Sequence, residues 1–123
     1  MRVFKTRPFG RFARSEDISD DALRETAARA EAGRIDADLG AGVIKQRVAR
    51  RGQGKSGGFR TIILFRRGAL AFFAYGFAKS DRDNIRADEL RAFRKLAHEM
   101  LRLDGRALAA AIANGTITEI ENS

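Results

Sequence analysis

The chain has 123 residues, of which 44% are hydrophobic and 33% charged, a length and apolar content that fit one folded domain and exclude a disordered chain. The absence of Cys excludes disulfides and thiolate metal sites, and a single His, His98, leaves little for zinc or imidazole chemistry. No uncharged stretch approaches the ~20 apolar residues of a membrane-spanning helix, and the first residues lack the apolar core of a signal peptide, so we expect a cytoplasmic protein that does not enter the membrane.

The first third of the chain predicts a strand followed by two helical segments. Arg2 to Lys5 is a candidate strand, and the spacing of Phe9 and Phe12 indicates a single helical turn packed on the core. Ser19 is suited to cap a helix whose first turn is acidic, and Gly33 is suited to end that helix.

The middle of the chain predicts three strands after a loop at Asp36–Gly42. The strands cover Val43–Ala49, Phe59–Arg66 and Leu70–Phe77. Only three residues connect the last two strands, which favours an antiparallel hairpin, so the strands are expected to form a meander.

The last part of the chain predicts two helices and a short strand. Apolar residues recur at helical spacing across Asp88–Leu103, an alanine-rich helix covers Gly105–Asn114, and Ile117–Ile120 alternates like an edge strand. The order β-α-α-β-β-β-α with a helix and strand tail predicts an α+β domain over residues 1–123, with a small antiparallel sheet and a C-terminal extension at residues 104–123.

The positive charge is concentrated in the middle third of the chain. Residues 1–42 hold eight basic and eight acidic side chains and residues 83–123 hold six and seven, whereas residues 43–82 hold ten basic side chains and one acid. Strand alternation places Lys45 and Arg47 on one face, and Arg60 is the only charge inside its apolar strand. Positive charge concentrated in this way predicts a polyanionic partner such as a nucleic acid. The alternative interpretation is a basic surface that is only solvated and binds no partner.

Residues 49–56 match a permissive phosphate-loop pattern, in which Gly-Lys-Ser follows four residues after Ala49. Such a loop works because it runs into a helix N-terminus, and here two glycines lead into a strand-rich segment instead. We therefore expect no nucleotide cofactor, and interpret the segment as a Gly-rich hairpin loop in which Arg50, Arg51 and Lys55 lie against a phosphate backbone.

Lys and Arg are the residues left for chemistry on a polyanion, since we expect no metal site and no cofactor. RNA makes this possible, because its 2′-hydroxyl attacks the adjacent phosphate once it is held in line. A guanidinium such as that of Arg60 can clamp the phosphate oxygens, and Lys55 or Lys79 can act as acid or base. Tyr75, the one Tyr, either stacks on a base or packs in the core.

Three segments together carry a resemblance to a known family. They are KQRVAR at residues 45–50, GQGKSGGFRTII at residues 52–63 and YGFAKSDRDNI at residues 75–85. With them the chain resembles the RelE/HigB-type toxins of type II toxin–antitoxin modules, in the RelE/ParE superfamily. The resemblance implies a microbial-RNase-like α+β fold, metal-independent cleavage of ribosome-bound mRNA, and neutralisation by a cognate antitoxin, often of the helix-turn-helix type.

The resemblance also implies roles for individual residues. The family's loop lysine falls on Lys55, its strand arginine on Arg60, and its later basic segment on Lys79 and Arg82. Arg47 and Arg50 correspond to residues of the family's positively charged groove. We therefore expect catalysis from Lys55, Arg60 and Lys79, and RNA binding from a second set: Lys45, Arg47, Arg50, Arg51 and Arg82.

Two other functions fit the same scaffold. A ParE-like relative would inhibit DNA gyrase by binding and would cut no RNA, and a non-catalytic RNA-binding protein would only position phosphates. The constellation of Lys55, Arg60 and Lys79 favours the nuclease, because a pure binder does not need it.

Overall fold

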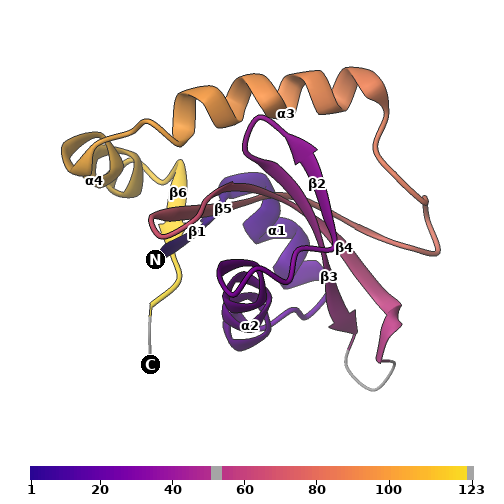
Figure 1. Ribbon diagram of the computed structural model, residues 1–123. Coiled ribbons are helices and arrows are strands. Elements are labelled where there is room, and N and C mark those ends of the chain that lie inside the picture. The colour runs from indigo at the N-terminus through magenta and orange to yellow at the C-terminus, as the bar shows by residue number, and fades with distance from the viewer. Residues whose placement is uncertain (51–53, 122–123) are drawn as a thin grey trace.

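The computed structural model describes residues 1–50 and 54–121, and the side chains of residues 49–57 lie outside that description. The elements run in the order β1 (Arg2–Thr6), α1 (Arg7–Ser15), α2 (Asp20–Glu31), β2 (Ala37–Gly40), β3 (Val43–Arg50), β4 (Gly54–Arg66), β5 (Leu70–Ala78), α3 (Ala87–Met100), α4 (Gly105–Ala113) and β6 (Ile117–Glu119). The α+β class and the mostly antiparallel sheet that the sequence predicts are confirmed (Figure 1).

The described strands form one sheet in the order β2-β3-β4-β5-β1-β6. The strands β3, β4 and β5 are antiparallel neighbours, which confirms the predicted meander. The first strand pairs in parallel with β5, and β6 pairs antiparallel with β1. The parallel pair was not predicted, because it joins segments far apart in the chain and leaves no local pattern.

Three elements, β2, α1 and β4, differ most from the sequence prediction. The segment predicted as a loop at Asp36–Gly42 contains β2, which pairs antiparallel with β3. The four residues of β2 end in a turn where Gly40, Ala41 and Gly42 all have positive φ. Because the glycines of this turn are typical of a loop, the sequence did not indicate the short strand before it. Likewise α1 is nine residues long and not a single turn, and β4 begins at Gly54.

The N-terminal caps explain where the first two helices begin. The hydroxyl of Thr6 accepts a hydrogen bond from the Phe9 N–H, and Pro8 lies in the first turn of α1, where a missing N–H costs nothing. Ser19 caps α2 as predicted, by accepting from the Ala22 N–H. After α2, Gly33 has a φ of 89° and ends the helix as predicted.

The helices cover the two faces of the sheet unequally. On one face α1 and α2 pack around Phe9, Leu23 and Phe73, and their cover continues to Val48 and Phe59 near the end of the β3–β4 hairpin. On the other face α3 and α4 pack over a core that includes Phe4, Phe72, Leu64, Met100 and Leu108. The hairpin extends beyond α3 (Figure 1). This second face is therefore left open where the hairpin protrudes.

Candidate nucleic-acid interface

A cross-strand row of side chains lies on the face of the sheet that α3 leaves open. In the register of the sheet Arg47 on β3 is opposite Arg60 on β4, and Arg60 is opposite Phe77 on β5. The next row joins Lys45, Ile62 and Tyr75. Alternation along β3 places Lys45 and Arg47 on one face, as predicted, and the pairing of β3 with β4 adds Arg60 to that face.

These cations line a shallow concavity of about 230 Å³. Its walls are Asp36, Ala37, Lys45, Arg47 and Arg60. Three positive charges against one carboxylate make the concavity attractive to an anion.

Arg60 is half-buried, and the Nη1 atom of its guanidinium is buried without a hydrogen-bond partner among the described residues. A buried donor left unpaired costs about 1–3 kcal/mol. Like charges directly opposite each other on neighbouring strands also destabilise a sheet. An anion in the concavity would relieve both costs.

Asp36 fixes the backbone and side chain of Arg47 at the edge of the concavity. Its carboxylate accepts from the Arg47 N–H at 2.7 Å and lies 3.6 Å from the Arg47 guanidinium and 3.9 Å from that of Arg29. The Arg47 side chain nevertheless stays 46% exposed, compared with 22% for Asp36. Arg47 therefore remains accessible to a ligand.

A buried amide supports the position of Asp36. The Gln46 side chain is fully buried on the opposite face of β3, where its Oε1 accepts from the Asp36 N–H at 2.6 Å. Its Nε2 donates to the carbonyl oxygens of Arg34 and Thr26 at 3.2 and 3.5 Å. The segment before β2 is thereby tied to the sheet.

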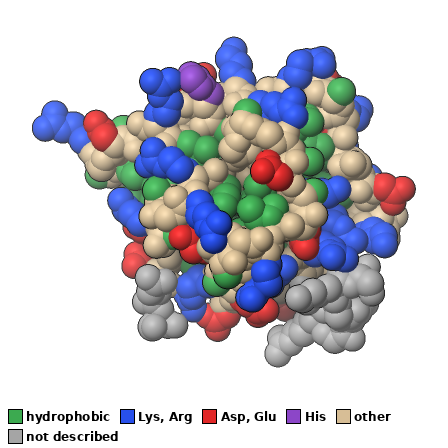
Figure 2. All heavy atoms as spheres, viewed as in Figure 1, with side chains coloured by type: hydrophobic (Ala, Val, Ile, Leu, Met, Phe, Trp, Pro, Cys, Tyr) green, Lys and Arg blue, Asp and Glu red, His purple; other side chains and the backbone are tan. Residues whose placement is uncertain are grey.

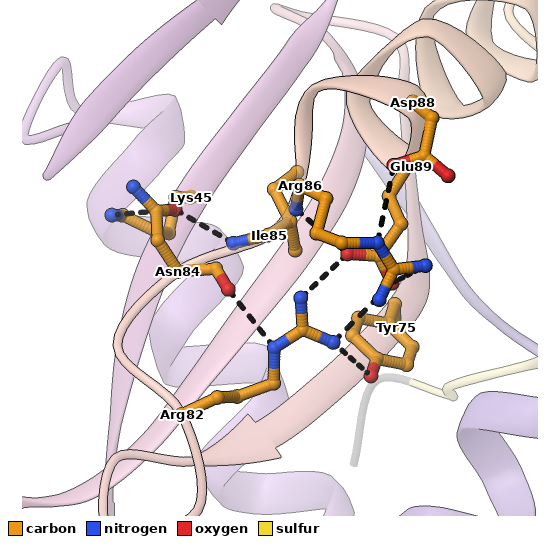
Figure 3. A network of polar contacts seen from close by, with 8 residues as sticks. All are labelled: Lys45, Tyr75, Arg82, Asn84, Ile85, Arg86, Asp88 and Glu89. Atoms are coloured by element: carbon orange, nitrogen blue, oxygen red, sulfur yellow. Dashed lines mark hydrogen bonds and ion pairs between the residues drawn. The ribbon is translucent and has the colours of Figure 1, made fainter.

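A second polar network lies beside the concavity, between β5 and the start of α3 (Figure 3). Arg82 donates from Nε to the Asn84 carbonyl, from Nη1 to the Tyr75 hydroxyl, and from both Nη atoms to the Glu89 carboxylate. Lys45 donates to the Asn84 side chain at 3.4 Å and so links this network to the concavity.

The carboxylate of Glu89 is held in its ionised form. Hydrogen bonds from Arg82, and then from the Arg86 N–H, lower the pKa of Glu89 from 4.5 to about 2. The same Glu89 partner raises the pKa of Arg82. This ion pair therefore stays charged across the physiological pH range.

The ring of Tyr75 packs against other aromatic rings. Its centroid lies 5.9 Å from that of Phe77 and 5.8 Å from that of Phe93, and the Arg82 guanidinium lies over it. One side of the ring also lines an apolar groove of about 590 Å³ between β5, α1 and α3. Packing and hydrogen bonding thus account for Tyr75, and its predicted stacking on a base stays a prediction.

The predicted site residues fall into four groups. Lys45, Arg47 and Arg60 meet in the concavity, and Arg82 lies in the adjacent network. Lys79 is exposed and directly follows β5, whose last residue, Ala78, pairs with Phe59 next to Arg60. The side chains of Arg50 and Lys55, and all of Arg51, lie outside the described residues. The structure therefore does not test whether Lys55, Arg60 and Lys79 converge.

Sequence reasoning missed three residues of this region. Asp36 was missed because it precedes a strand that was taken for a loop. Glu89 lies three residues after Arg86, in the spacing of a capping box, and that spacing was the one available signal. Asn84 gave no signal.

Positive charge is visible on the surface around this region. Figure 2 shows Lys and Arg side chains gathered at the right of the molecule, where Figure 1 places the segment between β5 and α3.

Within residues 1–50 and 54–121, no group of three or more acidic or His side chains is placed to hold a metal ion. In the same part of the chain, no helix is long and apolar enough to cross a membrane.

A family model described as the RelE toxin of the RelE/RelB toxin–antitoxin system matches residues 1–120. No curated protein matches the chain.

Proposed function

The chain belongs to the RelE toxin family of toxin–antitoxin systems, and from this premise we propose that it is a metal-independent endoribonuclease that cuts mRNA on the ribosome and so stops translation. Family membership implies a cognate antitoxin as its partner. We propose that this antitoxin is of the helix-turn-helix type.

One observation carries the proposal, the pairing of Arg47 with Arg60 around a concavity that holds one carboxylate. The pair is unfavourable for the fold alone, and Arg60 adds a buried donor without a partner among the described residues. Such an arrangement is expected where a site is organised for an anionic ligand. The scissile phosphate of RNA is the anion that fits the family.

The proposed reaction needs no cofactor. The 2′-oxygen forms a bond to the adjacent phosphorus, the bond from phosphorus to the 5′-oxygen breaks, and the 2′-proton leaves. The products are a 2′,3′-cyclic phosphate and a 5′-hydroxyl. Charge on the phosphate oxygens increases in the transition state, and there the Nη1 donor of Arg60 would contribute most.

The two proposed lysines complete the proton transfers. A lysine ammonium group can donate a proton to the departing 5′-oxygen, and a neutral lysine can accept the 2′-proton. We assign these roles jointly to Lys55 and Lys79. Arg47, Lys45, Arg50 and Arg51 would bind the flanking backbone.

The test is Arg60→Ala, with Arg66→Ala as the matched control. Arg66 lies on the same strand, is exposed, and stands opposite Leu70 at the other end of β4. We expect Arg60→Ala to abolish cleavage of ribosome-bound message and growth inhibition, and Arg66→Ala to leave both unchanged. Full toxicity of Arg60→Ala would refute the proposal.

Cells in which the unmodified protein is induced distinguish the nuclease from the two alternative functions. Primer extension on message from induced cells detects new 5′ ends if the protein cuts RNA. A gyrase inhibitor would instead stop DNA replication before translation, and an RNA-binding protein would stop translation without new ends.

A further inference from the structure

We propose that Glu89 is a positioning residue, which holds Arg82 and thereby fixes the segment that carries Lys79, and that Arg82 itself does not bind RNA. The inference rests on the proposed function, because Lys79 has a role there. It revises the expectation that Arg82 is an RNA ligand.

The hydrogen-bonding capacity of Arg82 is largely used within the protein. Its Nε donates to the Asn84 carbonyl at 2.9 Å and its Nη1 to the Tyr75 hydroxyl at 3.0 Å. Its Nη1 and Nη2 donate to the two Glu89 oxygens at 3.3 and 2.5 Å. One N–H of Nη2 has no partner among the described residues, so a phosphate could contact Arg82 there, but it could bind in a bidentate way only by displacing the Glu89 carboxylate or another of these partners.

Aromatic rings hold the same guanidinium in place. The Arg82 Cζ atom lies 5.4 Å from the ring centre of Phe77 and 5.8 Å from that of Tyr75, distances at which cation–π attraction operates. Both rings belong to β5, and Phe77 also stands opposite Arg60. Arg82 is therefore fixed to the strand that borders the concavity.

Glu89 connects Arg82 to a rigid element. It is in the first turn of α3 and accepts from the Arg86 N–H at 2.7 Å, which closes the helix N-terminus. Farther along, α3 is anchored in the core by Ala97 and Met100. The low pKa of Glu89, about 2, keeps this connection charged.

The connection limits the freedom of the segment between β5 and α3. At its start, the N–H groups of Asp81 and Arg82 donate to the Ala78 carbonyl. At its end, the Asn84 side chain accepts from the Ile85 N–H and from Lys45. Lys79 lies inside the segment and is exposed, so its place relative to the concavity depends on these bonds. Figure 3 shows the Arg82 guanidinium between Asn84, Tyr75 and Glu89.

The experiment compares Glu89→Gln with Asp88→Asn. Each variant removes one negative charge from the first turn of α3, but Asp88 is bonded through its side chain to Arg86 and not to Arg82. A Gln at position 89 keeps an oxygen that can accept from the Arg86 N–H, so the helix start is retained.

For cleavage of ribosome-bound message, we expect Glu89→Gln to lower kcat about tenfold, because small displacements of a catalytic group have large effects on rate. KM is expected to stay within about twofold, because no group that binds RNA is removed. Asp88→Asn is expected to match the unmodified protein. A rise in RNA affinity or in rate in Glu89→Gln would mean that Arg82 binds RNA and that Glu89 inhibits this binding, which would overturn the inference. Unchanged kinetics would overturn it as well.

Amide hydrogen exchange in the free protein provides a readout that does not depend on nuclease activity. We expect faster exchange across residues 79–86 in Glu89→Gln and not in Asp88→Asn. Equal exchange in the two variants would overturn the inference. If the unmodified protein cuts no RNA, the proposed function fails, and the exchange result alone then decides whether Glu89 holds the segment.

Discussion

Arg60 on β4 lies directly opposite Arg47 on β3, and Phe77 occupies the position on its other side. Two guanidinium groups in this relationship repel each other and weaken strand pairing. The Nη1 atom of Arg60 is also buried without a partner in the described part of the chain. The sheet thus holds a pair of charges that costs stability and favours an anion.

Replacement of Arg60 by Met should preserve or increase stability while it removes activity. Met has similar length and no charge, so both the repulsion from Arg47 and the unpaired donor disappear. We expect the free energy of unfolding in urea to stay the same or to rise by up to about 1 kcal/mol. A loss of more than about 2 kcal/mol would instead make Arg60 a structural residue.

Replacement of Arg47 by Ala should weaken RNA binding and reduce its dependence on salt. For single strands, log K falls with log salt by about 0.7 for each phosphate neutralised, so loss of one contact should make the slope less steep by about 0.7. Titration of a non-cleavable oligonucleotide over a range of salt concentrations measures this slope. An unchanged slope would mean that Arg47 does not bind phosphate, and Arg66→Ala provides the control.

The elements nearest this site show how far sequence reasoning reached. Alternation along β3 correctly placed Lys45 and Arg47 on one face, because a strand with one buried face has a strict period of two. The β2 strand was missed because backbone pairing with β3, and not side-chain pattern, holds its four residues in place. The parallel pairing of β1 with β5 depends on contacts between distant segments, which no local pattern encodes.

The contacts of Arg82 were harder to foresee. Its position in a basic segment suggested an RNA ligand, whereas the structure surrounds it with Glu89, Tyr75 and Asn84. Charge counted along the chain does not show which charges neutralise each other after folding. A network of this kind becomes visible when the strand, the connecting segment and the helix are assembled.

Acid should weaken the contribution of Glu89 to stability. The folded pKa of Glu89, about 2, lies below its ordinary value of 4.5, so its stabilising effect is present above pH 4.5 and is lost as the pH falls toward 2. The difference in unfolding free energy between the unmodified protein and Glu89→Gln should shrink over this range. A difference that is constant between pH 5 and pH 2.5 would contradict the ion pair with Arg82.

Gly76 should be intolerant of a side chain. An added Cβ would lie 2.4 Å from Cε2 of Phe12, so the ring that covers β5 would have to move. We expect Gly76→Ala to lower the free energy of unfolding by about 1–3 kcal/mol. In the Gly76→Ala background, Phe12→Leu should recover part of the loss.

The control for this prediction is Gly105→Ala at the start of α4. A Cβ there meets nothing within 4 Å, and alanine favours a helix, so stability should be equal or slightly higher. If Gly76→Ala proves as harmless as Gly105→Ala, the packing of α1 on β5 is looser than described.

The most direct test of the proposed reaction removes the 2′-oxygen, the attacking atom, from one nucleotide of the RNA. Ribosome-bound message is prepared with a 2′-deoxynucleotide at the mapped cleavage position, and the rate of cutting at that bond is compared with that of the unmodified message. We expect binding to persist and cutting at that bond to stop, because the attacking oxygen is gone. Cutting at an unchanged rate would contradict it.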